Sequence, residues 1–337
     1  MGVPIGILIS SIGGTNIEKW MPQSSFFRNA ILSEYYQKIE NWMEQYRKDL
    51  VTFQAPMKEW MKAVNESLLK HEDIPSMPYV PLHPSMPGSK YGGGQFSHLY
   101  NGMISPLYQF KIKGALWYQG ENNGEEERTY VEKMKEMIAA WRNGWGYEFP
   151  FLWVQLANFM AVEDQPKDSD WAELREAQNM TLSLPKTGQA VITDIGEAFD
   201  IHPKNKQEVG KRLAKAALQV AYGQPVLGEG PVYKSMKVEG EKVILTFGNV
   251  GDGLTTSDRN RYGYVNGFSI AGADRKFVWA KAYIDGNKVV VFSEKVPNPV
   301  AVRYGWSNNP YDDNLVNSAG LLASPFRTDQ WKGITEK

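Results

Sequence analysis

The sequence contains no cysteine, which excludes disulfides, thiol nucleophiles and cysteine metal sites. Basic and acidic residues nearly balance, 37 against 38, so no basic excess points to a nucleic-acid partner. No apolar run approaches the roughly 20 residues that a bilayer crossing needs. The opening residues, MGVPIGILISS, lack the basic region and cleavage site of a signal peptide. We therefore expect no nucleic-acid partner, no membrane span and no visible targeting address.

Apolar and aromatic residues are plentiful. Hydrophobic residues make up 42% of the 337 positions, which is enough to cover a large core in one or two domains. The 11 Trp, 17 Tyr and 14 Phe suit such a core, and they also suit stacking on sugar rings. The composition therefore predicts a folded globular protein. Its aromatic content fits either an ordinary core or a carbohydrate-binding surface.

Short apolar runs alternate with helical patterns in the first two thirds of the chain. The predicted strands are 3–10, 112–118, 149–157 and 189–195. The predicted helices are 124–144, 169–183 and 205–223, with the first ending at Gly144. Strands that alternate with helices predict parallel pairing through crossovers, and hence a three-layer α/β sandwich with an open sheet.

Two regions depart from this alternation. Residues 50–98 are rich in proline and read as an insertion, either a packed excursion with one helix or a flap that faces substrate. From about residue 225, strand patterns separated by Glu-Gly and Asp-Gly turns predict antiparallel pairing. We expect an α/β domain over 1–224 and a smaller β-rich domain over 225–337.

A polar stretch follows the predicted strand at 112–118, in KIKGALWYQGENN. It is either an ordinary polar loop or a tip that presents hydrogen-bond donors to a reacting group. Chemistry in open parallel sheets takes place beyond the carboxyl ends of the strands, which favours the second interpretation for Gln119 to Asn122.

Histidine is scarce, with four in the chain, and His202 is the one that lies just past a predicted core strand. Asp200 precedes it by two residues, and a helix follows. A carboxylate beside an imidazole fixes its tautomer and stabilises its protonated form, as a general base in acyl transfer requires. A helix cap beside a surface histidine explains the same pattern.

Three stretches, ILISSIGGTNIEKW, LYNGMISPLYQFKIKGALWYQGENN and DIHPKNKQEVGKRLA, closely resemble the sialate O-acetylesterases in order and spacing. VRYGWSNNP and GLLASPFRTD are similar to the C-terminal signature of that family. These are secreted carbohydrate esterases of the SGNH hydrolase superfamily. The resemblance implies a flavodoxin-like α/β/α domain, a small-molecule or glycan substrate carrying an acetyl ester, no cofactor, no metal, and a periplasmic or secreted location.

The resemblance also assigns roles to residues. Asn122 matches the family's Gly-x-Asn block and is implied as the side-chain oxyanion donor. The glycine block implies the backbone N–H of Gly13 or Gly14 as the second donor. His202 matches the catalytic base, and Asp200 is implied as its partner.

Two positions depart from the family pattern. Ile12 stands where the family has tryptophan, beside the glycine block. The superfamily spacing is Asp-x-x-His, but Phe199 occupies the position three residues before His202. Asp194, at the end of the preceding predicted strand, is therefore the alternative carboxylate partner.

The family's nucleophile lies in a Gly-Gln-Ser-Asn-Met string, and no such string occurs in the sequence. PQSS, which contains Ser24 and Ser25, precedes a predicted helix rather than following a strand. Ser10 and Ser11 end a predicted strand but match the oxyanion loop of the family. We therefore expect a chain without its first strand and serine block, either truncated, processed or degenerate, and an N-terminal fragment that supplies the serine.

Five more residues are weaker candidates for substrate contact: Gln119, Glu121, Arg175, Gln178 and Trp306. Arg175 and Gln178 lie at helical spacing and either face the substrate groove or face solvent. Alternative functions are a non-catalytic sugar-binding or accessory relative and an acetylxylan-type esterase. Metal-dependent hydrolysis by His202, Asp194 and Asp200 is a further alternative that lacks the usual histidine set.

Overall fold

The computed structural model describes residues 5–125, 127–258 and 262–336. The α-helices are α1 Gln23–Arg28, α2 Ser33–Lys70, α3 Glu127–Trp145, α4 Asp170–Thr181 and α5 Lys206–Val220. Short helical turns are η1 Ile17–Trp20, η2 Ala30–Leu32, η3 Tyr100–Ile104, η4 Ser105–Gln109 and η5 Glu121–Asn123. The first three strands are β1 Ala115–Trp117, β2 Phe151–Val154 and β3 Thr187–Ala190. The remaining strands are β4 Val232–Glu239, β5 Lys242–Gly248, β6 Leu254–Thr256, β7 Phe268–Ala271, β8 Val278–Trp279, β9 Lys281–Asp285, β10 Lys288–Phe292, β11 Ala301–Tyr304, β12 Leu315–Asn317 and β13 Phe326–Arg327.

The first three strands form a parallel sheet in the order β1-β2-β3. Trp153 of β2 pairs with Trp117 of β1 on one side and with Gln189 of β3 on the other. All three strands end at the same edge because they run in the same direction. The loops that follow these ends hold the polar residues that the sequence singled out.

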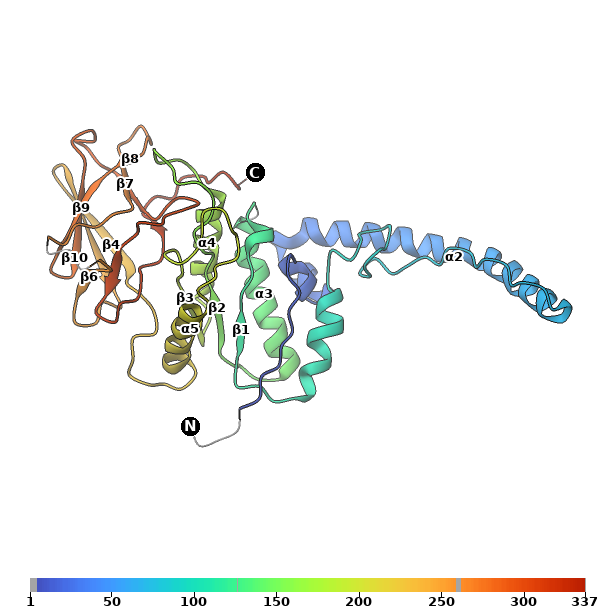
Figure 1. Cartoon of the computed structure of the whole chain (residues 1–337). Coiled ribbons are helices and arrows are strands. Elements are labelled where there is room, and N and C mark those ends of the chain that lie inside the picture. The colour runs from blue at the N-terminus through green and yellow to red at the C-terminus, as the bar shows by residue number, and fades with distance from the viewer. Residues whose placement is uncertain (1–4, 126, 259–261, 337) are drawn as a thin grey trace.

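Helices cover both faces of this sheet (Figure 1). Side chains of β2 alternate, with Phe151 and Trp153 packing in the cluster that contains α3 and α4. Leu152 and Val154 face the other way, into the cluster that contains α5. The predicted three-layer α/β arrangement with an open parallel sheet is confirmed, and the apolar runs are continuous because both faces of the strands are buried.

The helices begin and end close to the predicted positions, with one correction. The helix expected to end at Gly144 continues to Trp145, and Gly146 with a φ of 77° follows it. Gly144 lies inside the helix and packs against Tyr108. A Cβ at this position would lie 2.1 Å from the Tyr108 ring, so a larger residue would not fit. This glycine therefore permits close packing, and its neighbour Gly146 supplies the left-handed conformation that ends many helices.

The strand predicted over 3–10 is wrong for its described part. Residues 5–10 are in no strand, and Ile7 and Ile9 are 81% and 85% exposed. Ser10 holds the segment through a hydrogen bond of 3.1 Å from its Oγ to the Met103 carbonyl. An apolar run becomes a buried strand only where another strand accepts its backbone hydrogen bonds, and none of β1 to β3 pairs with this segment.

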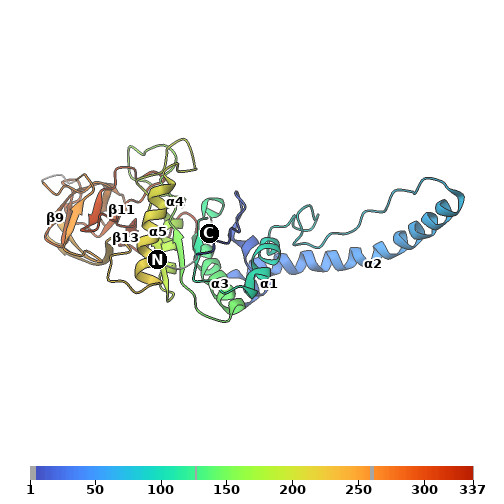
Figure 2. The same cartoon turned by 60° about the horizontal axis from the view of Figure 1, so that its bottom comes forward.

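Helix α2 projects from the body as a long arm, with the following chain folded back along it (Figures 1 and 2). Ile39 is the one residue of α2 that is buried. Trp60 donates from Nε1 to the Pro75 carbonyl at 2.8 Å, which ties the returning chain to the helix. The helix predicted within 50–98 thus begins at Ser33, well before the proline-rich stretch that suggested it.

The C-terminal third forms antiparallel sheets, in the orders β4-β5-β10-β9 and β13-β11-β7-β8, with β12 and β6 as a further pair. Gly240 and Gly286, with φ of 59° and 60°, occupy the predicted tight turns of the two hairpins β4-β5 and β9-β10. Val243, Val289 and Val302 pack between the sheets. The predicted antiparallel β part is confirmed, and it adjoins the α/β part through helix α4 and the loop after β11.

Candidate active site

A cavity of about 410 Å³ lies at the carboxyl end of β1. Its walls come from three segments that are distant in sequence, within residues 12–15, 118–122 and 201–206. Asn122 and His202 both line it, as do Gly13 and Gly14. The sequence predicted that these groups converge, and the structure brings them to one cavity.

The tip after β1 is held by close packing on α4 and β2. A Cβ at Gly120 would lie 2.9 Å from Leu156 and 3.2 Å from Leu174, so only glycine fits. Gln178 of α4 donates to the Gln119 carbonyl at 3.3 Å and accepts from the Leu156 N–H at 3.0 Å. Gln178 does not line the cavity and instead positions the tip.

Asn122 is exposed, and its Nδ2 donates to the Gly14 carbonyl at 2.7 Å. Its second amide hydrogen faces Asn16 Oδ1 at 3.5 Å, which is too long for a strong hydrogen bond. Gly14 has a φ of 65°, a left-handed conformation that glycine adopts without strain. This hydrogen bond holds the glycine loop against the tip after β1, and Gly14 and Asn122 both line the cavity.

Beneath the tip lies a buried polar network that the sequence analysis missed. Asn123 is 1% exposed, and its Oδ1 accepts from the Ile17 N–H at 3.0 Å and from Gln119 Nε2 at 2.8 Å. Its Nδ2 donates to Glu18, which forms a buried ion pair with Lys133. The short helix η5 turns Asn122 outward to solvent and Asn123 inward to this network. A helical turn predicted at Glu121–Asn123 would have separated these two roles.

Gln119 lines the cavity, but its side chain serves the loop. Its Nε2 donates to the Thr15 carbonyl at 3.0 Å, and its Oε1 accepts from the Tyr130 hydroxyl at 3.0 Å. These bonds join the tip after β1 to the glycine loop and to α3. Gln119 is therefore better placed to fix the cavity wall than to bind substrate.

His202 and Asp200 form a pair at the cavity's other wall. Asp200 Oδ1 accepts from the His202 backbone N–H at 2.9 Å and lies 3.3 Å from the ring Nδ1. The His202 side chain is 85% exposed, so the opposite ring nitrogen is free to accept a proton. The His202 backbone N–H is the main cause that lowers the pKa of Asp200, which keeps it a carboxylate.

The Asp-x-His spacing has a local explanation. An aspartate side chain often accepts from the backbone N–H two residues later, and this turn brings the carboxylate to the ring it follows. The alternative partner, Asp194, is committed elsewhere, with its two oxygens 2.6 Å and 2.8 Å from the Arg212 guanidinium. The geometry therefore favours Asp200 over Asp194 as the partner of His202.

Tyr118, Glu121 and Lys206 also line the cavity. Lys206 Nζ lies 3.4 Å from the Tyr118 hydroxyl and 4.6 Å from the centre of its ring. Burial raises the pKa of Glu121, and the nearby charges of Lys206 and His202 act in the opposite direction. Neither Tyr118 nor Lys206 was predicted as a site residue, although Tyr118 directly follows β1 and Lys206 begins α5 after His202.

Arg175 is a correction, because it neither lines this cavity nor faces solvent. It is fully buried, and it donates to the carbonyls of Leu156, Ala157, Ser307 and Asn308. Burial lowers the pKa of Arg175 to about 9. Its role is to fasten α4 and the end of β2 to the loop after β11.

Trp306 also lies outside this cavity. It is 4% exposed, and it lines a separate, larger cavity in the C-terminal part of the molecule. Trp306 and His202 therefore line different cavities.

No serine lines the cavity of Asn122 and His202 among the residues that the structure describes. Ser10 bonds to the Met103 carbonyl, and Ser25 is buried in α1. The arm contributes no residue to the cavity wall either, so within the described ranges it does not act as a flap over it.

In the described part of the chain, no helix has the combination of length and apolarity that crossing a bilayer takes.

The chain is similar to a known family of carbohydrate esterases. The family model described as carbohydrate esterase, sialic acid-specific acetylesterase, matches residues 86–219. Rat sialate O-acetylesterase is 29% identical over 72% of this chain, and the mouse protein of the same name is 27% identical over 96%. The matched region of the family model includes Asn122, Asp200 and His202.

A solved structure is also similar. A carbohydrate acetylesterase from Xanthomonas citri superposes with a TM-score of 0.67 and 51% identity, over 71% of this chain and 56% of its own. The chain spans 44% of the rat relative and 60% of the mouse relative. The resemblance predicted from the sequence motifs is confirmed by these matches.

Proposed function

We propose that this chain is a carbohydrate esterase of the sialic acid-specific acetylesterase family, whose model matches residues 86–219, and that its cavity hydrolyses acetyl esters on sialic acid or related sugars. One observation carries the proposal: the amide of Asn122, the glycine loop and His202 line one cavity of about 410 Å³, and Asp200 pairs with His202 beside it. Acyl transfer needs a proton acceptor and oxyanion donors on opposite sides of one carbonyl, and this cavity offers both kinds of group.

The proposed reaction begins when a serine hydroxyl attacks the acetyl carbonyl and His202 takes the hydroxyl proton on its free ring nitrogen. The carbonyl oxygen gains negative charge, which Asn122 and a backbone N–H of Gly13 or Gly14 stabilise. The C–O bond to the sugar then breaks, and His202 returns the proton to the leaving sugar hydroxyl. Water then attacks the acetyl-serine carbonyl while His202 takes one of its protons. The bond from the carbonyl carbon to the serine oxygen breaks, His202 returns the proton to that oxygen, and acetate and the serine hydroxyl result.

Asp200 supports His202 in both halves of this reaction. Its carboxylate at Nδ1 holds the ring so that the other nitrogen faces the ester, and it stabilises the protonated ring. Because Asp200 is itself held by the His202 backbone, the pair moves as one unit. Asp200 acts through His202 and touches no substrate, so it is a positioning residue.

The nucleophilic serine belongs, in our proposal, to a Gly-Gln-Ser-Asn-Met segment other than the residues described here. It is supplied either by an adjoining part of the polypeptide or by an N-terminal fragment. Covalent attack is what makes acyl transfer fast at neutral pH, so the described residues alone supply binding and electrostatic stabilisation without a nucleophile.

The lack of a serine in the cavity wall favours a second candidate. A relative that retains the cavity for sugar binding alone would keep the same glycine loop, amide and aromatic groups without turnover. Acetylated xylan is an alternative substrate because related folds act on several acetylated glycans. A cationic group beside the base, Lys206, favours an anionic sugar such as sialic acid.

Acetate release distinguishes these functions. The 337-residue chain and a form extended or complemented with the Gly-Gln-Ser-Asn-Met segment would be assayed on O-acetylated sialic acid and on acetylated xylo-oligosaccharides. We expect turnover only in the serine-containing form, abolished when that serine is replaced by alanine. A folded serine-containing form that is inert on both substrates contradicts the esterase proposal, and sugar binding by that inert form supports the accessory function.

We also propose that residues 1–224 and 225–337 are separate domains and that the protein acts in the periplasm or outside the cell. Limited proteolysis checks the first point by testing for cleavage near residue 225. Fractionation of the native host checks the second, and a cytoplasmic location would contradict it.

A further inference from the structure

A second cavity, larger than the one that His202 lines, lies in the C-terminal part of the molecule. Its volume is about 740 Å³, and strands β7 to β10 and the loop after β11 enclose it. Three of its aromatic residues are well exposed, Trp279 at 40%, Tyr264 at 61% and Tyr311 at 58%. Several exposed aromatic rings around one concavity mark a binding site more often than an isolated exposed ring does.

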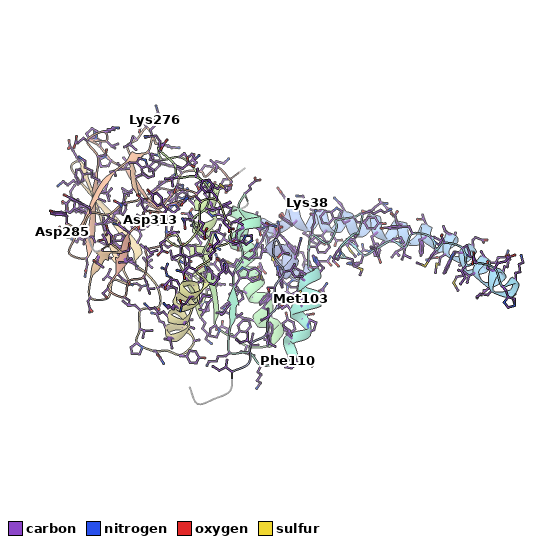
Figure 3. All side chains as sticks on the ribbon, in the orientation of Figure 1. Lys38, Met103, Phe110, Lys276, Asp285 and Asp313 are labelled. Carbon is purple, nitrogen blue, oxygen red and sulfur yellow. The ribbon has the colours of Figure 1, made fainter. Side chains whose placement is uncertain are left out.

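The cavity also holds a buried acid with nothing to bind. Asp313, which Figure 3 labels, is 3% exposed. Neither of its carboxyl oxygens has a hydrogen-bond partner among the residues that the structure describes. Burial raises the pKa of Asp313 well above its usual range, with the nearby Asp312 acting in the same direction. A buried polar group without a partner is costly, and its persistence calls for a ligand or another compensating group.

Two glycines make room for this acid. A Cβ at Gly267 would lie 1.9 Å from Asp313 Oδ1, and a Cβ at Gly305 would lie 2.2 Å from Oδ2. Both glycines line the same cavity, and both have a positive φ. The backbone is thus shaped so that the carboxyl group sits at the cavity wall.

Trp306 is a second buried group without a partner in the same wall. Its indole Nε1 has no acceptor among the residues that the structure describes, and the Arg303 and Arg327 guanidinium groups stack at 5.0 Å and 5.3 Å from its ring. An indole N–H that is buried usually finds an acceptor. The wall of this cavity therefore contains one donor and one acid that no described residue satisfies.

We propose that this cavity is a second saccharide site, which holds uncharged sugar units of the glycan whose acetyl ester is cleaved at His202. Aromatic faces pack against the C–H faces of sugar rings, and carboxyl, amide and indole groups bond to sugar hydroxyls. The volume lies within the range of about 300 to 1,000 Å³ that is typical of sites for ligands larger than one small ion. The link to the acetyl ester rests on the proposed function, whereas saccharide binding does not.

The charges around the cavity favour neutral over anionic sugars. Lys281 is the one cation among the described lining residues, and Glu294 pairs with it at 2.8 Å. Glu163 pairs with Lys167 at 2.7 Å, while Asp312 adds a further negative charge to the wall. The carboxylate of an anionic sugar would be repelled by the carboxyl groups of this cavity, whereas the Lys206 ammonium would attract it in the cavity of His202.

The two cavities are mechanically connected through asparagine side chains. Asn309, in the wall of the C-terminal cavity, accepts from Asn158 Nδ2 at 2.8 Å and donates to the Met160 carbonyl at 2.6 Å. Asn158 Oδ1 in turn accepts from the Gly196 N–H at 2.6 Å, in the loop that leads to His202. A glycan held at the C-terminal cavity is therefore fixed relative to that loop.

Isothermal titration calorimetry on the full chain tests the proposal. The probes are xylotetraose and lacto-N-tetraose as neutral saccharides, trisialic acid as an anionic one, and tetramethylammonium as a cation, because aromatic and acidic side chains also bind cations. We expect at least one neutral saccharide to bind, and trisialic acid to bind the Tyr311→Ala protein and the unchanged protein equally. Replacing Tyr311 or Trp279 by alanine should weaken the neutral saccharide about tenfold.

Tyr79→Ala is the matched control, because Tyr79 is 59% exposed on the arm and far from the cavity wall. Circular dichroism confirms that each variant is folded, and Asp313→Asn gives an isosteric second test at the cavity wall. Failure of both neutral probes to bind overturns the proposal, as does binding that Tyr311→Ala and Trp279→Ala leave unchanged. Binding of tetramethylammonium in place of the saccharides also overturns it.

Failure of the saccharide-site proposal can be distinguished from failure of the esterase proposal. Saccharide binding that persists without acetate release from the serine-containing form means that the esterase proposal alone has failed. Acetate release by a protein that binds neither neutral saccharide means that the second site alone has failed.

Discussion

The two cavities of the molecule are built on different kinds of sheet and offer different chemistry. The smaller one lies past a parallel strand and holds titratable groups beside backbone glycines, with His202 and Asp200 exposed to solvent. The larger one lies among antiparallel strands and offers aromatic faces and a buried acid, Asp313. A solvent-exposed imidazole that can take up a proton suits the site where a bond breaks. Aromatic side chains suit recognition of a part of the ligand that does not react.

Removal of the base should separate the cavities most completely. In the serine-containing form, we expect His202→Ala to lower kcat by about 10⁴-fold or more, because attack by a serine requires a proton acceptor. Saccharide binding at the C-terminal cavity should not change. His71→Ala, at the exposed C-terminal cap of α2, is the matched control.

Acetate release by His202→Ala at the unchanged rate would assign the base to another residue. A loss of rate accompanied by equal loss of saccharide binding would show instead that the two cavities act as one site.

Arg175→Ala should damage both cavities together, because Arg175 joins β2 and α4 to the loop that leads to the C-terminal cavity. Four backbone carbonyls would lose their donor, at a cost of about 3 to 5 kcal/mol in the free energy of unfolding. Chemical denaturation measures this, with the exposed Arg47→Ala as control. A change below about 1 kcal/mol would refute the fastening role.

Asn122→Ala should affect the smaller cavity alone. We expect kcat to fall by about 10²- to 10³-fold with little change in KM, since an oxyanion donor acts on the transition state. Asn65→Ala, on the arm, removes an exposed amide that no cavity uses and should be silent. A rise in KM at constant kcat would make Asn122 a substrate-binding residue instead.

Lys206→Met should change the choice of sugar. We expect KM for O-acetylated sialic acid to rise by about five- to tenfold, because a charged partner of the sugar carboxylate is lost, while KM for a neutral acetylated sugar stays constant. Lys211→Met on the exposed face of the same helix is the control. Equal changes for both sugars would deny Lys206 a role in selecting charge.

Glu121 gives the smallest effect, through pH. Burial raises its pKa above the unfolded value, so its contribution to stability is complete below the unfolded pKa and is lost as pH rises through the folded pKa. Glu121→Gln should therefore raise Tm at pH 7, by no more than about 3 °C, and leave it unchanged near pH 4. Thermal unfolding at the two pH values checks this, and a lower Tm at pH 7 would contradict it.

The sequence predicted the parts of the fold that local patterns determine. Apolar runs gave β1 and β2, and Ser169 and Asn205 cap α4 and α5 by accepting from backbone N–H groups at 3.0 Å and 3.1 Å. The segment 5–10 has the same apolar pattern as those strands but remains unpaired with them, because pairing depends on neighbours that no local pattern encodes.

The candidate site divides in the same way. Asn122 and His202 follow strand ends, a position that the sequence marks, so their common cavity could be predicted. Arg175 looked like a surface or groove residue because its spacing says nothing about the distant carbonyls of Ser307 and Asn308 that bury it. The C-terminal cavity could not be predicted either, since its aromatic residues come from several strands and loops that only the tertiary fold brings together.

The most direct test observes both sides of the smaller cavity during ligand binding. Two-dimensional NMR of the chain would follow the side-chain amide of Asn122 and the imidazole of His202 while an O-acetylated sialic acid is added. We predict that both signals shift along one binding curve, with a single Kd. Shifts at one of the two residues only, or at two different concentrations, would contradict a shared reacting centre.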